Sequence, residues 1–393
     1  MMKGIKDRVA IVGMGCTNFG ELWDKDYKDL MVDACYEAFE DAGVEPKDIQ
    51  AAWYGSRESG FTGSHLANAL KLEYIPITRV ENFCAGGTDT FRNACYSVAA
   101  GIFDIALACG VEKTKDHMGG FTMDITEPFD RSMVEWELPP VSQFAQLANG
   151  YFNKYGLSYE QGKKILAKIA VKNHHNGTLS PKAHFRREIT LEQAINAPMI
   201  SYPLGLFDAC GMSDGGAAAI ITTPEIAKSM RKDYILVKAL ALDNGGGQGK
   251  LQSDYDFSYI PETVEAGKLA YKEAGIKNPR QEVDLAIVHD CFTITELIIC
   301  EDLGFSPRGK APEDVEAGTF ELTGDLPVNT DGGLKCFGHP LSASGLRMIY
   351  EVYKQLQGKA EARQLKKADI GLVHNVGGVC GYFNCAVAIL GKP

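Results

Sequence analysis

The sequence predicts an α/β fold built from two related halves. Apolar stretches typical of buried strands alternate along the chain with amphipathic stretches of helical period, which is the pattern of a layered α/β protein. A length of 393 residues suits two ordinary domains or one duplicated fold. In each half an apolar strand leads into a cysteine-bearing corner and then a helix, at residues 82–84 (Asn-Phe-Cys) and 289–291 (His-Asp-Cys). This repeat favours a duplicated fold with a ligand site between its halves.

The elements of the first half follow from their side chains. Strands are expected where apolar or small residues run together, and helices where apolar residues recur every three to four positions. The predicted strands are 8–15, 49–55, 78–83, 104–111 and 214–222. The predicted helices are 29–42 and 88–100.

A second cycle of elements begins near residue 234. Its predicted strands are 235–242, 283–288, 370–376 and 383–390. Its predicted helices are 261–274, 293–303 and 343–356.

The segment between about 112 and 202 breaks the alternation. It is rich in Met, Pro, His and aromatic residues, with helical patches at 143–155 and 159–173, and we interpret it as an inserted lobe. We therefore divide the chain into an N-terminal half, an insertion and a C-terminal half. Their predicted boundaries are 1–112 plus 206–232, 113–205, and 233–393.

Composition narrows the possible partners. The formal net charge of −11 disfavours nucleic acid and anionic membranes, and no apolar run approaches the roughly 20 residues of a membrane span. The eleven cysteines include no Cys-x-x-Cys pair, so neither a disulfide framework nor a zinc ribbon is expected. Free thiols, together with an N-terminus that lacks an apolar signal region, predict a cytoplasmic protein.

A dinucleotide site is excluded by one position. Gly13 and Gly15 follow a predicted strand, but the third glycine of the fingerprint would fall at Asn18. Without it the motif fails.

Cys84 is the first candidate for chemistry. It lies in residues 82–87, Asn-Phe-Cys-Ala-Gly-Gly, where a strand gives way to a helix. Small residues let the chain turn and let a ligand approach, and a helix N-terminus favours the thiolate. These features indicate a nucleophile, against the alternative of a buried, unreactive cysteine.

Three further clusters contain candidate partners for such a nucleophile. His289 and Cys291 follow a predicted buried strand, so both side chains could face one cavity; a core histidine beside a core cysteine is the alternative. His339 precedes a proline in a glycine-rich loop, so its backbone is restricted and it suits the role of a base. The glycines of residues 374–381, His-Asn-Val-Gly-Gly-Val-Cys-Gly, could bring backbone N–H groups to a carbonyl oxygen or could form a plain turn.

In their order along the chain these motifs resemble the thiolase superfamily. The resemblance covers essentially the whole chain and includes residues 213–218 (Ser-Asp-Gly-Gly-Ala-Ala), 289–292 (His-Asp-Cys-Phe) and 338–340 (Gly-His-Pro). The His-Asp-Cys-Phe form is similar to the sterol-carrier-protein-type and archaeal thiolases. The resemblance implies a duplicated thiolase fold, with two βαβαβαββ halves in α-β-α-β-α layers and an inserted loop domain.

It also implies roles for the candidate residues. Cys84 would attack the 3-oxo carbonyl of a 3-oxoacyl-CoA and carry the acyl group, and His339 would take its proton. His289 and His339 would flank the first oxyanion. The backbone N–H groups of Cys84 and of Gly377 or Gly378 would form a second oxyanion hole.

The second thiol of the reaction has two candidates. In this subgroup the resemblance assigns the acid/base role to the cysteine of the His-Asp-Cys-Phe motif, here Cys291. Many thiolases instead take it from a C-terminal Cys-x-Gly loop, but that loop starts with His374 here and its cysteine, Cys380, lies further along. We expect Cys291 and keep Cys380 as the alternative.

The resemblance further implies ligands and partners. CoA and acyl-CoA thioesters would be substrates, with no permanently bound cofactor and no metal. We expect a homodimer core, and a small accessory subunit with a zinc ribbon and an oligonucleotide/oligosaccharide-type β-barrel.

Two substrates fit the sequence. Phe337, Tyr382 and Phe383 suggest an aromatic acyl group, as in a benzoylsuccinyl-CoA thiolase, which would yield benzoyl-CoA and succinyl-CoA. Acetoacetyl-CoA is the simpler alternative. The rivals from other classes are a Claisen-forming synthase and an aldolase-type or non-catalytic subunit of the same fold, in which the nucleophile is typically missing.

Overall fold

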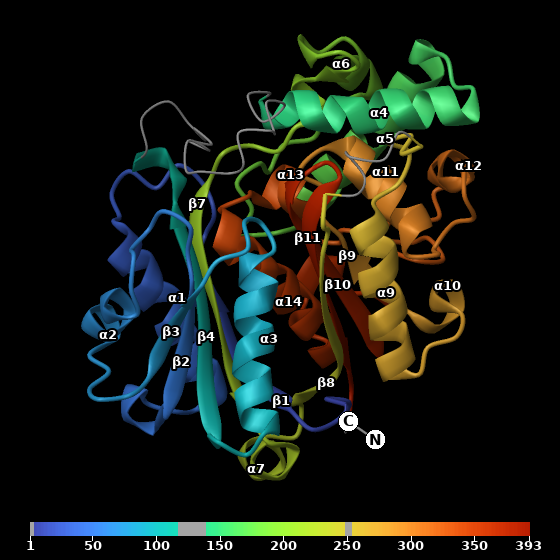
Figure 1. Ribbon diagram of the computed structural model, residues 1–393. Helices are drawn as coiled ribbons and strands as arrows, with labels where there is room; N and C mark the ends of the chain where they lie inside the picture. Colours follow the sequence, from blue (N-terminus) through green and yellow to red (C-terminus); the bar gives the residue numbers. More distant parts are fainter. Residues whose placement is uncertain (1–3, 117–138, 248–253) are drawn as a thin grey trace.

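The computed structural model describes residues 4–116, 139–247 and 254–393. Its central feature is a nine-stranded mixed sheet with the strand order β3-β2-β4-β7-β1-β8-β11-β10-β9 (Figure 1). The strands are β1 (Ala10–Cys16), β2 (Ala51–Gly55), β3 (Ile77–Val80), β4 (Ile105–Lys113), β7 (Asp214–Thr222), β8 (Ile235–Asn244), β9 (Leu285–Ile287), β10 (Ile370–Val379) and β11 (Tyr382–Gly391).

The sheet is duplicated about its centre. Reading outward from the middle, the first half runs β1-β7-β4-β2-β3 and the second half runs β8-β11-β10-β9. In each half the first strand is central and the last strand lies next to it. Val328 forms a parallel bridge to Ala286 of β9, at the position that β3 occupies in the first half. The halves meet where β1 and β8 pair antiparallel, with Ala10 opposite Leu236. The predicted duplicated α/β fold is confirmed.

Strand β4 shows why the central strands read as continuous apolar runs. Side chains alternate between the two faces of a strand. Leu107 and Cys109 join the apolar cluster that contains helix α1, while Ala106 and Ala108 join the cluster that contains helix α3. Both faces of the sheet are therefore covered, and neither face can be polar.

Helices pack on both halves of the sheet as further layers. Helix α1 (Tyr27–Ala42) packs on β1, β7 and β4, and α9 (Pro261–Ala274) packs on β8 and β11. Helices α3 (Gly86–Ala99) and α14 (Leu341–Gln357) pack on each other between the halves (Figure 1). The close approach needs glycine, because a Cβ on Gly87 of α3 would lie 2.3 Å from the carbonyl oxygen of Ser342 on α14.

The insertion lies at one end of these layers, where Figure 1 shows α4 and α5 crossing above the sheet. Both predicted helical patches are confirmed, as α4 (Pro140–Tyr155) and α5 (Tyr159–Thr178). The insertion also contains α6 (Leu191–Ile195) and the two-stranded pair β5 (Met199–Ser201) and β6 (Leu204–Gly205). Residues 117–138 of the predicted insertion lie outside the described residues, and its predicted boundaries stay a prediction.

Several short helices were not expected from the sequence. They are α2 (Ser64–Leu70), α7 (Pro224–Met230), α10 (Pro279–Glu282), α12 (Ala311–Glu316) and α13 (Gly333–Phe337). Helix α11 (Thr293–Asp302) agrees with its prediction. The segment before His339 was expected to be a glycine-rich loop, but α13 forms there because the buried Asp290 carboxylate accepts the N–H groups of its first turn. Within the described part of the chain, no helix is both long and apolar enough to span a bilayer.

Candidate active site

Four of the five predicted catalytic side chains line one cavity. The side chains of Cys84, His289, Cys291 and His339 surround a cavity of ≈150 Å³. Cys380 is buried but is not among the described residues that line this cavity. Residues from both halves of the fold therefore line one cavity, and the repeat predicted a ligand site between the halves.

Each of these side chains follows the carboxyl end of an element. Cys84 lies between β3 and α3, two residues before the first residue of the helix. His289 and Cys291 lie between β9 and α11, and His339 lies between α13 and α14. Strand β3 ends at Val80, earlier than predicted, and Phe83 turns the chain with a φ of 50°. Such strand ends are the usual place for a site in an α/β sheet.

The nucleophile and both imidazoles are close neighbours. The Sγ atom of Cys84 and one ring nitrogen each of His289 and His339 all lie within 4.8 Å of one another. The two imidazole rings are perpendicular, at 85°, with centroids 5.2 Å apart. The Nε2 atoms of both rings are buried and have no hydrogen-bond partner among the described residues.

The hydrogen bonds of His339 select its tautomer. The Ser344 hydroxyl donates to the carbonyl oxygen of Pro340 at 3.0 Å. Its oxygen must then accept from Nδ1–H of His339, which lies 2.8 Å away. The lone pair of His339 is therefore on Nε2, the unpartnered nitrogen, so this side chain is placed to act as a base.

His289 has the opposite tautomer. The Thr88 hydroxyl donates to Oδ1 of Asn375, which fixes the orientation of that amide. The amide nitrogen of Asn375 then faces Nδ1 of His289 at 3.5 Å. Because Nδ1 accepts, Nε2 carries the proton, and His289 is placed to donate a hydrogen bond.

Burial keeps both imidazoles neutral. It lowers the pKa of His339 to about 3, with a smaller contribution from the positive charge of Arg347. Burial also lowers the pKa of His289 well below its usual value, and His339 lowers it further. Neutral rings are required for the base and donor roles that their tautomers provide.

The thiol of Cys84 is also neutral at rest. Burial raises its pKa well above the usual value, the nearby Cys210 raises it further, and Arg57 offsets part of the rise. Desolvation therefore opposes the thiolate that the helix N-terminus was expected to favour. Nucleophilic attack then needs a base, and His339 is within reach.

Cys210 is a thiol that the sequence analysis missed. It lines the same cavity as Cys84 and Cys291, and its N–H donates to the carbonyl oxygen of Cys291 at 2.8 Å. No local signal marks Cys210, since only the antiparallel bridge between Ala209 and Phe292 brings it to the site. Burial raises the pKa of the Cys291 thiol well above its usual value, so Cys291 holds its proton at neutral pH.

The C-terminal glycines lie against the nucleophile. A Cβ on Gly377 would be 2.6 Å from the backbone nitrogen of Cys84, so only glycine allows this approach. Gly378 lines the cavity and has a φ of 101°. Gly377 thus lies against the backbone of Cys84, and Gly378 lines the same cavity as Cys84.

The aromatic side chains at the cavity differ from those that were expected. Phe337 is buried against Phe19, with ring centroids 5.0 Å apart, and does not line the cavity. Tyr382 and Phe383 are also not among its lining residues. Phe144 and Phe292 line it instead, and their ring centroids are 4.8 Å apart.

The donor set Cys84, His289 and His339 has the composition of a zinc site. A zinc ligand must present a lone pair, however, and the hydrogen bond from Asn375 to Nδ1 of His289 leaves Nε2, the unpartnered nitrogen, carrying the ring hydrogen. The arrangement therefore suits proton transfer and oxyanion binding better than metal binding.

Comparison with known proteins agrees with this geometry. Residues 9–225 match the family described as Thiolase, N-terminal domain, and residues 248–392 match Thiolase C-terminal domain-like. The chain is 38% identical over 383 residues to an acetyl-CoA acetyltransferase of Methanothermobacter thermautotrophicus, covering 95% of this chain and 97% of that protein. It is 30% identical to the benzoylsuccinyl-CoA thiolase subunit BbsB of Thauera aromatica, covering 96% of each.

A solved structure is similar over the same extent. The Ltp2-ChsH2(DUF35) aldolase superposes with a TM-score of 0.86 at 27% identity, covering 99% of this chain and 98% of that chain. The two family matches together cover most of the sequence, and they include all the residues that line the cavity. The chain therefore belongs to the thiolase family of acyltransferases.

Proposed function

We propose that the protein is a thiolase that cleaves a 3-oxoacyl-CoA with CoA. The acyl group of this substrate is short and uncharged, and acetoacetyl-CoA is the representative substrate. The observation that carries the proposal is the cluster of Cys84 Sγ with the ring nitrogens of His289 and His339, all within 4.8 Å. It contains a nucleophile, a base and a hydrogen-bond donor in one cavity.

The first step forms a bond from Cys84 to the 3-oxo carbon. Nε2 of His339 takes the thiol proton as Sγ attacks, and the carbonyl oxygen becomes an oxyanion. Nε2–H of His289 donates to this oxyanion. Because one such donor contributes about 3 kcal/mol to the transition state, His289 is expected to matter for rate rather than for binding.

The second step breaks the carbon–carbon bond. The oxyanion collapses to a thioester on Cys84, and the electron pair of the broken bond passes to the departing acyl-CoA as an enolate. Cys291 protonates that enolate, because its buried thiol keeps its proton at neutral pH.

The third step transfers the acyl group to CoA. The Cys291 thiolate takes the proton of the incoming CoA thiol, which attacks the acyl-enzyme. The backbone N–H groups of Cys84 and of Gly377 or Gly378 would hold this second oxyanion. Collapse releases the new acyl-CoA, and the Cys84 sulfur regains its proton from His339.

The cavity lining favours an uncharged acyl group. None of the described residues that line it carries a charged side chain. A benzoylsuccinyl group has a free carboxylate, which becomes that of succinyl-CoA, and burying a carboxylate without a cation is costly. The similarity to BbsB supports the benzoylsuccinyl alternative, whereas the higher identity to an acetyl-CoA acetyltransferase agrees with the uncharged lining.

An accessory subunit is part of the proposal. BbsB is named as a subunit, and the Ltp2 structure contains the DUF35 protein ChsH2. We infer that this chain forms a dimeric core that binds a small partner protein of that kind. Co-purification from the native source, followed by measurement of the mass of the complex, tests this.

The function is tested with acyl-CoA substrates and intact mass. Acetoacetyl-CoA without CoA should leave an acetyl adduct on Cys84 that free CoA then removes, while Cys84→Ala should show no adduct. A thiolysis panel including benzoylsuccinyl-CoA, run with and without the accessory subunit, ranks the substrates. Absence of any adduct on Cys84 would favour the aldolase-type alternative, which the Ltp2 similarity otherwise supports.

A further inference from the structure

Asp290 lies between His289 and Cys291 in the sequence but does not line the catalytic cavity. Its side chain is completely buried. One carboxylate oxygen accepts the N–H of Leu334 at 2.5 Å, and the other accepts the N–H of Lys335 at 3.2 Å.

These two N–H groups begin α13, and α13 ends two residues before His339. One carboxylate thus connects the strand end that carries His289 and Cys291 to the segment that carries His339. The contact is close, because a Cβ on Gly333 would lie 2.2 Å from Oδ2 of Asp290.

A side-chain amide holds the carboxylate from the other side. Nδ2 of Asn173, on α5, donates to Oδ2 of Asp290 and to Oε2 of Glu296, each at 2.8 Å. Its two hydrogens therefore bridge two buried carboxylates. Glu296 also accepts from Nδ2 of Asn329 at 2.8 Å.

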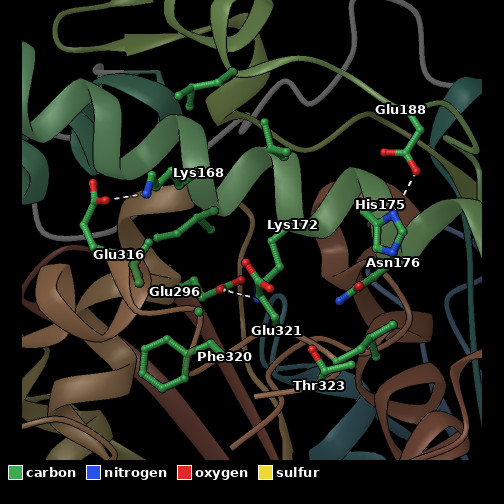
Figure 2. Close-up of a pocket in the computed structure, with 16 residues that line it drawn as sticks. Lys168, Lys172, His175, Asn176, Glu188, Glu296, Glu316, Phe320, Glu321 and Thr323 are labelled. Atoms are coloured by element: carbon green, nitrogen blue, oxygen red, sulfur yellow. Dashed lines mark hydrogen bonds and ion pairs between the residues drawn. The ribbon is translucent and has the colours of Figure 1, made fainter. Parts of the chain in front are cut away.

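Glu296 marks the far end of this network. Its Oε1 forms an ion pair with Lys172 at 2.6 Å. Figure 2 shows this pair at the wall of a second cavity of ≈540 Å³, which is separate from the catalytic cavity. The network thus fixes Asp290 through side chains that do not contact the catalytic cavity.

We propose that Asp290 is a positioning residue for the thiolase reaction, which holds His289 and Cys291 in register with His339 and is itself held by Asn173 and Glu296. The proposal rests on the proposed function. Nucleophile, acid and base come from three separate segments, and a displacement of about 1 Å between reacting groups can reduce a rate about 100-fold.

The ionisation of Asp290 makes the positioning role measurable, through the pH dependence of activity. Burial raises its pKa to about 7; Glu296 contributes to the rise, and Arg347 opposes it. The groups around it are Glu296 from α11, Arg347 from α14, the backbone N–H groups of α13 and the amide of Asn173. The buried thiols of Cys210, Cys291 and Cys336 also interact with its charge. Only the ionised carboxylate accepts all of these hydrogen bonds, so activity should decline as the pH falls below about 7.

Asp290→Asn provides the direct test. The amide keeps the shape but presents an N–H where an acceptor is needed. We expect kcat for acetoacetyl-CoA thiolysis to fall about 100-fold, with KM for CoA changed less than twofold. An unchanged kcat, or equal changes in kcat and KM, would contradict the positioning role.

Glu296→Gln tests the network without touching Asp290. Removal of the negative charge of Glu296 should lower the pKa of Asp290. In a plot of kcat against pH, the decline on the acid side should then move to lower pH. Glu301→Gln is the matched control on the same helix, because Glu301 contacts Tyr151 and Ala311 rather than Asp290. A decline that stays in place in Glu296→Gln, or moves equally in Glu301→Gln, overturns the proposal.

Alkylation of Cys84 by iodoacetamide gives a readout that needs no substrate. Displacement of His339 should slow alkylation in Asp290→Asn at pH 8, with the modified residue identified by peptide mass. If the wild type lacks thiolase activity but this difference persists, the proposed function fails and the positioning role stands. If alkylation is unchanged in a folded Asp290→Asn variant, the positioning role fails.

Discussion

The Ser344 hydroxyl lies 2.8 Å from Nδ1 of His339 and donates its own hydrogen to Pro340. This pairing leaves the lone pair of His339 on Nε2, which has no hydrogen-bond partner among the described residues. A single hydroxyl on α14 thus decides whether the imidazole is a base or a donor. It acts through the tautomer and need not touch the substrate.

Ser344→Ala should therefore reduce kcat without changing substrate binding. A positioned acid–base group contributes roughly 10²–10⁴ to the rate, and we expect loss of tautomer control to remove about 10- to 100-fold of it. Steady-state kinetics should show this fall in kcat with KM for CoA nearly constant. Ser342→Ala, two residues away, is the control, since its hydroxyl has no hydrogen-bond partner among the described residues. Equal losses in both variants would indicate a packing effect.

The motif residues were predictable because each is marked locally. Cys84 follows a strand and precedes small residues, and His339 precedes a proline, so short sequence windows identify both. Their partners are not marked in this way. Ser344 is an ordinary helix serine in sequence, and Asn375 acts only because β10 places it beside His289.

Tertiary contacts also explain the expectations that were wrong. Cys210 reaches the cavity through an antiparallel bridge between residues 83 positions apart, Ala209 and Phe292, which no local pattern reveals. Phe337 was expected at the acyl group, but one turn of α13 directs it onto Phe19 instead. That turn exists because of Asp290, a contact between residues 44 positions apart.

The second thiol should be identified by two cysteine variants. Cys291→Ala should still be acylated by acetoacetyl-CoA, slowly, and should lose multiple turnover, because the enolate lacks its proton donor. Cys380→Ala should keep its turnover, since Cys380 does not line the cavity. The readouts are the adduct mass and the steady-state rate. Full activity in Cys291→Ala would transfer the role to Cys380 or to Cys210, and Cys210→Ala then distinguishes them.

Gly377→Ala should disable the site through the backbone. The added Cβ would meet the backbone nitrogen of Cys84 at 2.6 Å and that of Ala85 at 2.8 Å, so the nucleophile segment must move. We expect loss of measurable thiolysis with a lowered melting temperature. Gly20→Ala is the control, because its Cβ would find no atom nearer than 3.8 Å. Retained activity in Gly377→Ala would show that this approach is not part of the oxyanion hole.

The buried His374 should make stability depend on pH in a measurable way. Burial lowers its pKa to about 3, from an ordinary value of 6.5. Between these values the unfolded chain binds a proton that the folded protein does not, so folding is destabilised as the pH falls below 6.5. From pH 7 to pH 5 the loss is about 2 kcal/mol for one histidine. Asp302 acts in the opposite sense, because burial raises its pKa to about 7 and the folded protein gains a proton as the pH falls.

The test is therefore the difference in the free energy of unfolding between the wild type and His374→Gln, measured by urea unfolding at each pH. The glutamine can keep a hydrogen bond to Thr263, which the imidazole makes at 3.0 Å, but it does not titrate. We expect the free energy of unfolding of the wild type, relative to His374→Gln, to fall by about 2 kcal/mol between pH 7 and pH 5. A difference independent of pH would show that folding leaves the pKa of His374 unchanged.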